Sequence, residues 1–319
     1  MKHIGYVGTY DSKCSQGVYR FKFDDVTGKL TKPTSFYKTN GGKCVALTDE
    51  FVVVTREIPG KSGIALLDKN GTVLSEAFME RASACFIGCR DKFVYTANYH
   101  DGVVMIYKIA NQKLQLVKKL VNGSETGCHQ VMCWRSNIFV PCLKLDCINI
   151  YDMGKNFLLT DKIVFSPGTG PRHGVFTTDE RLYLVSELSN ELFYYHLVQN
   201  NSWELISKMS FLPEQSATGS ASAALRLSGD GRFIYISTRG SNLLSVFSIE
   251  GATPKMIQQI SCGGDHPRDF LLSGNGEYLL VVNRLSNELI SMKINKTTGM
   301  IGAIADRTEV HEGVGIALE

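Results

Sequence analysis

The sequence contains no long apolar segment and no stretch with convincing helical periodicity. None of its hydrophobic runs approaches the roughly 18 residues of a membrane-spanning helix. The first residues, MKHIGYVGTY, enter a predicted strand without the apolar core of a signal peptide. Apolar residues do not recur with the 3.6-residue period of an amphipathic helix. We therefore expect a cytoplasmic protein that is built from strands and has no membrane partner.

Short motifs of common catalytic and cofactor sites are also missing. No GxSxG, HExxH, Walker or GxGxxG pattern stands in a suitable structural setting. The net charge is only +3 and is dispersed, which argues against nucleic acid as a partner. The nine cysteines lie mostly within apolar runs, and the pairs Cys85 with Cys89 and Cys128 with Cys133 have poor spacing for zinc. Buried, reduced thiols without a structural metal are the expectation.

What the sequence does contain is a repeat in which two short apolar strands flank a polar turn. It recurs seven times at intervals of roughly 45 residues. Val, Ile, Tyr and Phe dominate the strands, and Asn, Ser, Asp or Gly occupy the turns, as is typical of β-hairpins. The seven hairpins begin at His3, Phe51, Phe93, Ile138, Leu182, Phe233 and Tyr278.

Flanking segments complete each hairpin to a four-stranded unit. Six hairpins follow another apolar run, as in SAALRLSGDGRF and RDFLLSGNGEYL, and each is followed by a more polar strand-like run. Four antiparallel strands in this length form one blade of a β-propeller. The first hairpin lacks a preceding run, and the tail HEGVGIALE aligns with HPRDFLLSG. We predict an all-β, single seven-bladed propeller domain over residues 1–319, in which a strand near Val314 to Leu318 completes the first blade.

This topology predicts which polar residues meet at one mouth of the central channel. In an antiparallel blade, the start of the inner strand and the end of the next strand lie at the same edge. The inner strands begin near Lys43, Ser83, His129, Arg172, His173, Ser222, His266 and Arg268. The following strands end near Tyr10, Arg56, Asn98, Cys142, Glu187, Arg239 and Arg284. Arginines and histidines dominate this set, so we expect a cationic funnel for a small anionic ligand.

Four of these residues suit hydrolysis of a carbonyl compound. His129 or Glu187 can take a proton from water. Arg172 and Arg239 can bind an anion or stabilise an oxyanion. We interpret Asp269, beside Arg268, as a member of an ion pair between blades. A structural role for each His and Arg, in pairs across blades, is the alternative.

The sequence resembles the seven-bladed propeller lactonases, which include bacterial 6-phosphogluconolactonase and the fungal carboxymuconate lactonizing enzyme. The resemblance runs from the first strand to the last and rests on YVGTY, ANY, GPRHGVF, ELSN, SAALRLSGDGRFIYISTRG and HPRDFLLSGNGEYLLVVN, which begin at Tyr6, Ala97, Gly170, Glu187, Ser222 and His266. It implies catalytic roles for His129, Arg172, Glu187 and Arg239, without a metal or organic cofactor. We expect His173, His266, Arg268, Arg284, Asn98 and Tyr10 to bind the substrate.

The resemblance implies a hydrolase of the pentose phosphate pathway that converts 6-phosphogluconolactone to 6-phosphogluconate. The chain departs from the family pattern at GCHQV around His129, where a second histidine is usual, and at TRG from Thr238, where NRG is usual. Two alternatives therefore stay open. One is a lactonizing enzyme for a carboxylated muconate-type substrate, and the other is a non-catalytic propeller that binds a metabolite or a protein.

Overall fold

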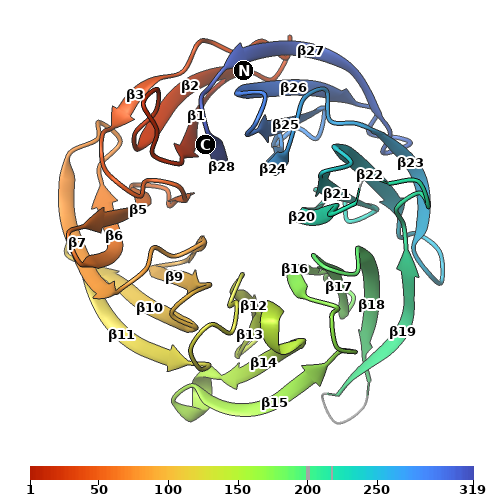
Figure 1. Cartoon of the computed structure of the whole chain (residues 1–319), viewed down its shortest axis with the longest axis horizontal. Coiled ribbons are helices and arrows are strands. Elements are labelled where there is room, and N and C mark those ends of the chain that lie inside the picture. Colours follow the sequence, from red (N-terminus) through yellow and green to blue (C-terminus); the bar gives the residue numbers. More distant parts are fainter. Residues whose placement is uncertain (199–201, 217) are drawn as a thin grey trace.

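Seven four-stranded antiparallel sheets stand as blades around a central channel (Figure 1). The structure is a computed structural model and describes residues 1–198, 202–216 and 218–319. Each blade is built from strands that are consecutive in the sequence, except the first, which also takes the last strand of the chain. The prediction of an all-β propeller with seven blades is confirmed.

The two strands nearest the axis carry the residues that face or border the channel. The innermost strands are β28 (Gly313–Leu318), β4 (Val45–Leu47), β8 (Phe86–Arg90), β12 (Met132–Trp134), β16 (Pro171–Phe176), β20 (Ala221–Leu227) and β24 (Pro267–Leu272). The second strands are β1 (Lys2–Thr9), β5 (Val52–Ile58), β9 (Phe93–Asn98), β13 (Asn137–Cys142), β17 (Arg181–Ser186), β21 (Phe233–Arg239) and β25 (Tyr278–Asn283).

The outer half of each blade ends in a strand with one solvated face. The third strands are β2 (Val18–Asp24), β6 (Lys61–Leu67), β10 (Val103–Ala110), β14 (Cys147–Asp152), β18 (Glu191–Leu197), β22 (Leu243–Ser248) and β26 (Glu288–Ile294). The outer strands are β3 (Thr34–Tyr37), β7 (Val73–Glu80), β11 (Lys113–Val121), β15 (Leu158–Val164), β19 (Trp203–Ser210), β23 (Lys255–Ser261) and β27 (Ile301–Glu309).

Strand β28 closes the ring, as the sequence predicts. It pairs antiparallel with β1, and the register places Val7 opposite Ile316 and Gly5 opposite Leu318. The first and last segments of the chain therefore share one sheet, and N and C lie close together in Figure 1. Because this blade joins both ends of the sequence, the ring has no open junction between its first and last repeats.

The core lies between the blades rather than in one central mass. One buried cluster combines Val7 and Phe21 of the first blade with Leu280 and Val282 of the last. The other clusters likewise combine side chains of neighbouring blades. Burying each such side chain is worth roughly 1.5–3 kcal/mol, so every blade is stabilised by both of its neighbours.

Helical structure is confined to two 3₁₀ turns within the described residues, η1 (Leu143–Leu145) and η2 (Met153–Lys155). The first forms the turn between β13 and β14, where Asp146 ends it in a left-handed conformation with φ of 47°. No helix in the described part of the chain is long and apolar enough to cross a membrane.

Candidate active site

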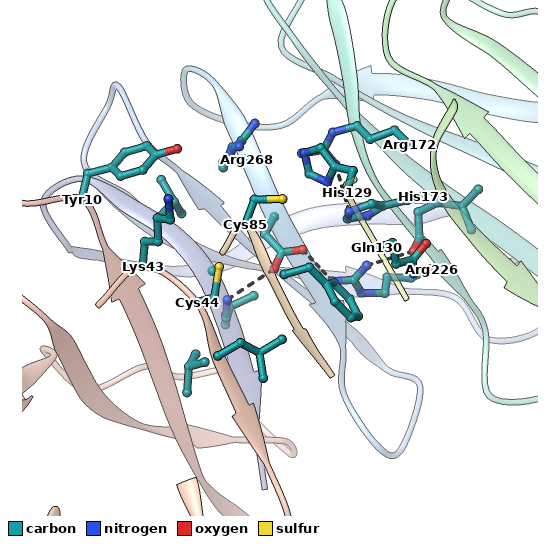
Figure 2. A pocket seen from close by; sticks show the side chains of 18 of the residues that line it. Tyr10, Lys43, Cys44, Cys85, His129, Gln130, Arg172, His173, Arg226 and Arg268 are labelled. Atoms are coloured by element: carbon teal, nitrogen blue, oxygen red, sulfur yellow. Dashed lines mark hydrogen bonds and ion pairs between the residues drawn. The ribbon is translucent and has the colours of Figure 1, made fainter. Parts of the chain in front are cut away.

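A cavity of about 340 Å³ occupies the central channel, and all seven inner blade edges contribute to its wall (Figure 2). Its volume lies at the lower end of the range for small-molecule sites. The polar or ionisable side chains on the wall are Tyr10, Lys43, Cys44, Cys85, His129, Gln130, Arg172, His173, Arg226, Arg268 and Asp269. Four of them are Lys or Arg and one is a carboxylate, so the wall is predominantly cationic.

Backbone hydrogen bonds hold the start of an inner strand against the end of the next one. The amide of Glu187 donates to the carbonyl of Gly170 at 2.8 Å, and the amide of Arg284 donates to His266 at 3.0 Å. The amide of Tyr10 donates to Glu312, also at 3.0 Å. The topological argument therefore identifies the correct end of these blades, although not every side chain there turns into the cavity.

Arg172, Glu187 and Arg239 form one ion-pair network that spans two blades. The Nε of Arg172 donates to Oε2 of Glu187 at 2.7 Å, and Nη2 of Arg239 lies 3.0 Å from the same oxygen. Arg172 is only 2% exposed, and its Nη1 donates to the carbonyl of Ala223. Charge-assisted bonds of this kind fix the orientation of a guanidinium group, so Arg172 is held rigidly in the cavity wall.

The charges in this network control the ionisation of its members. Burial opposes ionisation of Glu187, but the positive charges of Arg172 and Arg239 outweigh it and lower the pKa of the carboxyl group. Burial lowers the pKa of Arg172 to about 9, and Glu187 counteracts that effect. At neutral pH the network therefore contains one carboxylate and two guanidinium cations.

His129 and His173 lie together beside this network. Their rings meet edge to face with centroids 5.2 Å apart, and Nη1 of Arg172 lies 3.2 Å from Nε2 of His173. The Nδ1 atoms of both histidines are buried without a hydrogen-bond partner among the described residues. Burial first, and then the charge of Arg172, lower the pKa of each imidazole well below its usual value. Both rings are therefore neutral at pH 7.

Three of the residues predicted to bind the substrate do not line the cavity. Asn98 is completely buried and donates to Glu80 at 3.0 Å and to the carbonyl of Ala82. Arg284 forms a 2.7 Å ion pair with Glu312. His266 adopts a φ of 65°, and burial together with nearby arginines lowers its pKa to about 4. Glu187 and Arg239 do not line the cavity either, but Glu187 binds Arg172, which does, and Arg239 binds Glu187.

The cavity wall includes residues that were not singled out as binding residues in the sequence. The sequence places Lys43 at the start of an inner strand and assigns it no role. Arg226 lies inside the SAALRLSG run, where alternation alone cannot show which neighbouring blade it meets. It forms a 2.6 Å ion pair with Asp269, which confirms that Asp269 belongs to an ion pair between blades.

All nine cysteines are free thiols, and two of them, Cys44 and Cys85, line the cavity. Burial raises the pKa of Cys44 to about 12 and that of Cys85 to about 11. Both are therefore neutral thiols and poor nucleophiles at neutral pH. Within the described residues, no group of three or more His, Cys, Asp or Glu side chains is arranged to hold a metal ion.

The fold and the cavity together define a propeller with an anion-attracting site on its axis. Residues 4–318 match the family described as "Lactonase, 7-bladed beta-propeller". The chain therefore belongs to the seven-bladed β-propeller lactonase family.

Individual relatives agree with this assignment over the full length of the chain. The 6-phosphogluconolactonase of Bacillus subtilis is 27% identical over 336 residues, which cover 97% of this chain and 96% of that protein. A protein of known structure from Lactobacillus plantarum is 26% identical, with a TM-score of 0.93 and complete coverage of both chains. The periplasmic gluconolactonase of Pseudomonas aeruginosa, 21% identical, shares the fold with a TM-score of 0.89 over 100% of this chain and 99% of its own.

Proposed function

We propose that this protein hydrolyses a phosphorylated sugar lactone, namely 6-phosphogluconolactone, to 6-phosphogluconate in the cytoplasmic pentose phosphate pathway. The observation that supports the proposal most strongly is the cationic cavity on the propeller axis, where buried Arg172 and neutral His129 share one wall. Membership of the lactonase family and similarity to a 6-phosphogluconolactonase support the same reaction class. A phosphorylated lactone is an anion, which fits the surplus of positive charge.

In the proposed reaction, the oxygen of a water molecule attacks the lactone carbonyl carbon. His129 accepts a proton from this water, which it can do because its ring is neutral. The tetrahedral oxyanion is stabilised by Nη2 of Arg172, for which the described residues supply no partner. The ring carbon–oxygen bond then breaks, His129 returns its proton to the leaving ring oxygen, and the carboxylic acid product releases a proton to solvent.

Glu187 acts in this proposal as a positioning residue rather than as the base. Its Oε2 binds Nε of Arg172 at 2.7 Å and Nη2 of Arg239 at 3.0 Å, so two cations compete with any proton for that oxygen. His129 is a weak base because its pKa is low. A δ-lactone already hydrolyses spontaneously, so a general-base contribution of roughly 10²- to 10⁴-fold is sufficient.

Proton release from freshly generated 6-phosphogluconolactone, measured at pH 7 with chelator present, tests the proposal. We expect wild-type protein to accelerate hydrolysis and His129→Ala to lose most of that acceleration. His129→Ala must retain the wild-type urea midpoint, so that lost activity is not lost folding. Glucaro-1,4-lactone, which carries a carboxylate in place of the phosphate ester, serves as the second substrate. Absence of acceleration with both lactones would overturn the proposal and favour a non-catalytic binding propeller.

A further inference from the structure

The cavity holds a second cationic group that the proposed hydrolysis does not use. Lys43 precedes β4, Arg268 lies in β24 and Tyr10 follows β1, so these residues belong to three consecutive blades of the closed ring. Figure 2 shows Tyr10 and Lys43 on the side of the cavity away from Arg172 and His173, with Arg268 between Tyr10 and His129 in this view. The Nζ of Lys43 lies 6.0 Å from the centre of the Tyr10 ring.

Arg268 stands out because its charge has no direct partner. Arg172 and Arg239 share Glu187, and Arg226 pairs with Asp269 at 2.6 Å. In residues 1–198, 202–216 and 218–319, the guanidinium of Arg268 makes neither a hydrogen bond nor an ion pair. The positive charge of Arg268 also affects other residues of the site, because it helps to lower the pKa values of His129, Arg172 and Glu187.

The guanidinium of Arg268 stays charged in the free protein. Burial opposes the charge, but the nearby Tyr10 and Glu187 outweigh that effect and raise the pKa of Arg268. The side chain is only partly buried and has no hydrogen-bond partner in the described residues, so its donors are available to an anionic ligand. A guanidinium donates two parallel hydrogen bonds to the oxygens of a phosphate, which makes Arg268 well suited to a phosphoryl group.

Close backbone packing fixes the position of the Lys43 backbone at the cavity wall. A Cβ atom on Gly8 would lie 2.5 Å from the carbonyl oxygen of Lys43, and one on Gly315 would lie 2.7 Å from the same oxygen. Only glycine at these two positions lets β1 and β28 approach the segment so closely. The Nζ of Lys43 makes a single 3.3 Å hydrogen bond, to the carbonyl of Ser83, which leaves donors for a ligand.

We propose that Arg268, Lys43 and the hydroxyl of Tyr10 form a subsite for the phosphoryl group of the substrate, while the lactone carbonyl lies against His129 and Arg172. This inference rests on the proposed function. It assigns the preference for phosphorylated over neutral lactones to Arg268 and Lys43, and it defines the substrate class as sugar lactones with a dianionic group remote from the reacting carbonyl.

Hydrolysis of 6-phosphogluconolactone and of unphosphorylated δ-gluconolactone by the same variants tests the assignment. We expect Arg268→Gln to raise the KM for the phosphorylated lactone roughly 10- to 100-fold, as for loss of a charge-assisted contact. The kcat/KM for δ-gluconolactone should change less than about threefold, because that substrate has no group for the subsite. Lys43→Gln should likewise raise the KM for the phosphorylated lactone and leave kcat/KM for δ-gluconolactone nearly unchanged. Equal losses with both lactones would overturn the subsite.

Arg307→Gln is the matched control because it removes the same charge from the outer strand of the same blade. Arg307 pairs with Glu288 at 3.0 Å and lies far from the cavity wall. We expect this variant to match wild type on both lactones. If it raised the KM for the phosphorylated lactone as much as Arg268→Gln does, overall charge rather than a subsite would be responsible, and the proposal would be wrong.

Calorimetric titration with inorganic phosphate separates failure of the subsite from failure of the proposed function. Wild-type protein should bind phosphate, and Arg268→Gln should weaken the binding at least tenfold. Phosphate binding that depends on Arg268, in a protein that hydrolyses no lactone, would support the subsite and reject the hydrolase. Lactone hydrolysis with no phosphate binding and no preference for the phosphorylated substrate would support the hydrolase and reject the subsite.

Discussion

The two sides of the cavity differ in whether their cationic side chains have direct partners within the protein. On the side of blades five and six, Arg172 and Arg239 both bind Oε2 of Glu187, and each also donates to backbone carbonyls. On the side of blades one, two and seven, Arg268 has no such partner in the described chain, and Lys43 has one long hydrogen bond.

This difference separates groups that must be held from groups that must remain available. A guanidinium with its own carboxylate keeps one orientation whether or not a ligand is present, which is what stabilisation of a transition state requires. A cation without a direct hydrogen-bond partner in the protein keeps its donors available, which favours binding of an anion. The paired side is therefore suited to chemistry, and the unpaired side to selection of the substrate.

The largest effect should come from the paired side. Arg172→Lys keeps the positive charge but loses the planar fork that binds Glu187 through Nε and the carbonyl of Ala223 through Nη1 and still presents Nη2. We expect kcat for 6-phosphogluconolactone to fall roughly 10²- to 10³-fold, as for loss of one oxyanion donor. Steady-state proton release measures it, and the urea midpoint shows whether the variant is folded. A folded variant with wild-type kcat would show that this network is only structural.

A smaller effect is expected on the pH dependence of kcat/KM, because Arg268 on one side of the cavity lowers the pKa of His129 on the other. Burial, then Arg172, then Arg268 lower the pKa of this imidazole, so wild-type kcat/KM for δ-gluconolactone should stay level as pH falls well below 6.5. Removing the positive charge in Arg268→Gln raises the pKa of His129. The acid limb of the pH profile should therefore move to higher pH.

Profiles measured from pH 4 to 8 with the neutral lactone check this shift, because that substrate does not change charge over the range. Arg307→Gln serves as the control and should leave the limb where it is. An acid limb that does not move in Arg268→Gln would mean that His129 is not the titrating base.

The smallest effect concerns the free energy of unfolding. It compares Glu187, which binds two arginines, with Glu80, a buried carboxyl group that binds no cation in the described part of the chain. Glu80 is 4% exposed, accepts one hydrogen bond from Asn98 and has Oε2 unpaired among the described residues. Burial raises its pKa from 4.5 to about 7. Between these values the unfolded chain ionises Glu80 while the folded chain does not, so the free energy of unfolding falls as pH rises and is level above pH 7.

Glu80→Gln should remove this pH dependence and make the protein more stable than wild type at pH 8, by on the order of 2 kcal/mol. Urea unfolding at pH 5 and pH 8 provides the measurement. Glu187→Gln should behave with the opposite sign, since the lowered pKa of Glu187 stabilises the folded state above about pH 4.5 and the gain is lost as pH falls. A wild-type slope in Glu80→Gln would show that Glu80 is ionised in the folded protein.

Much of the fold was predictable because it repeats. Seven hairpins with polar turns specify seven blades, and the tail HEGVGIALE could be assigned to the first blade as β28 because it aligns with the inner strand HPRDFLLSG. Antiparallel topology also indicated the correct edge of the blades for His129, Arg172 and Arg268. The direction of each side chain at that edge was not predictable, and Asn98 turned out to bind Glu80 rather than face the cavity.

The sequence alone therefore determined the strands, their order and the end of the channel at which the cations gather, because these follow from local alternation and repetition. Only the tertiary structure decided which charges neutralise one another. The register between β24 and β25 shifts at Arg268, and Asp269 binds Arg226 of the preceding blade rather than the adjacent Arg268. That choice depends on how two blades pack, and it leaves the charge of Arg268 for the cavity.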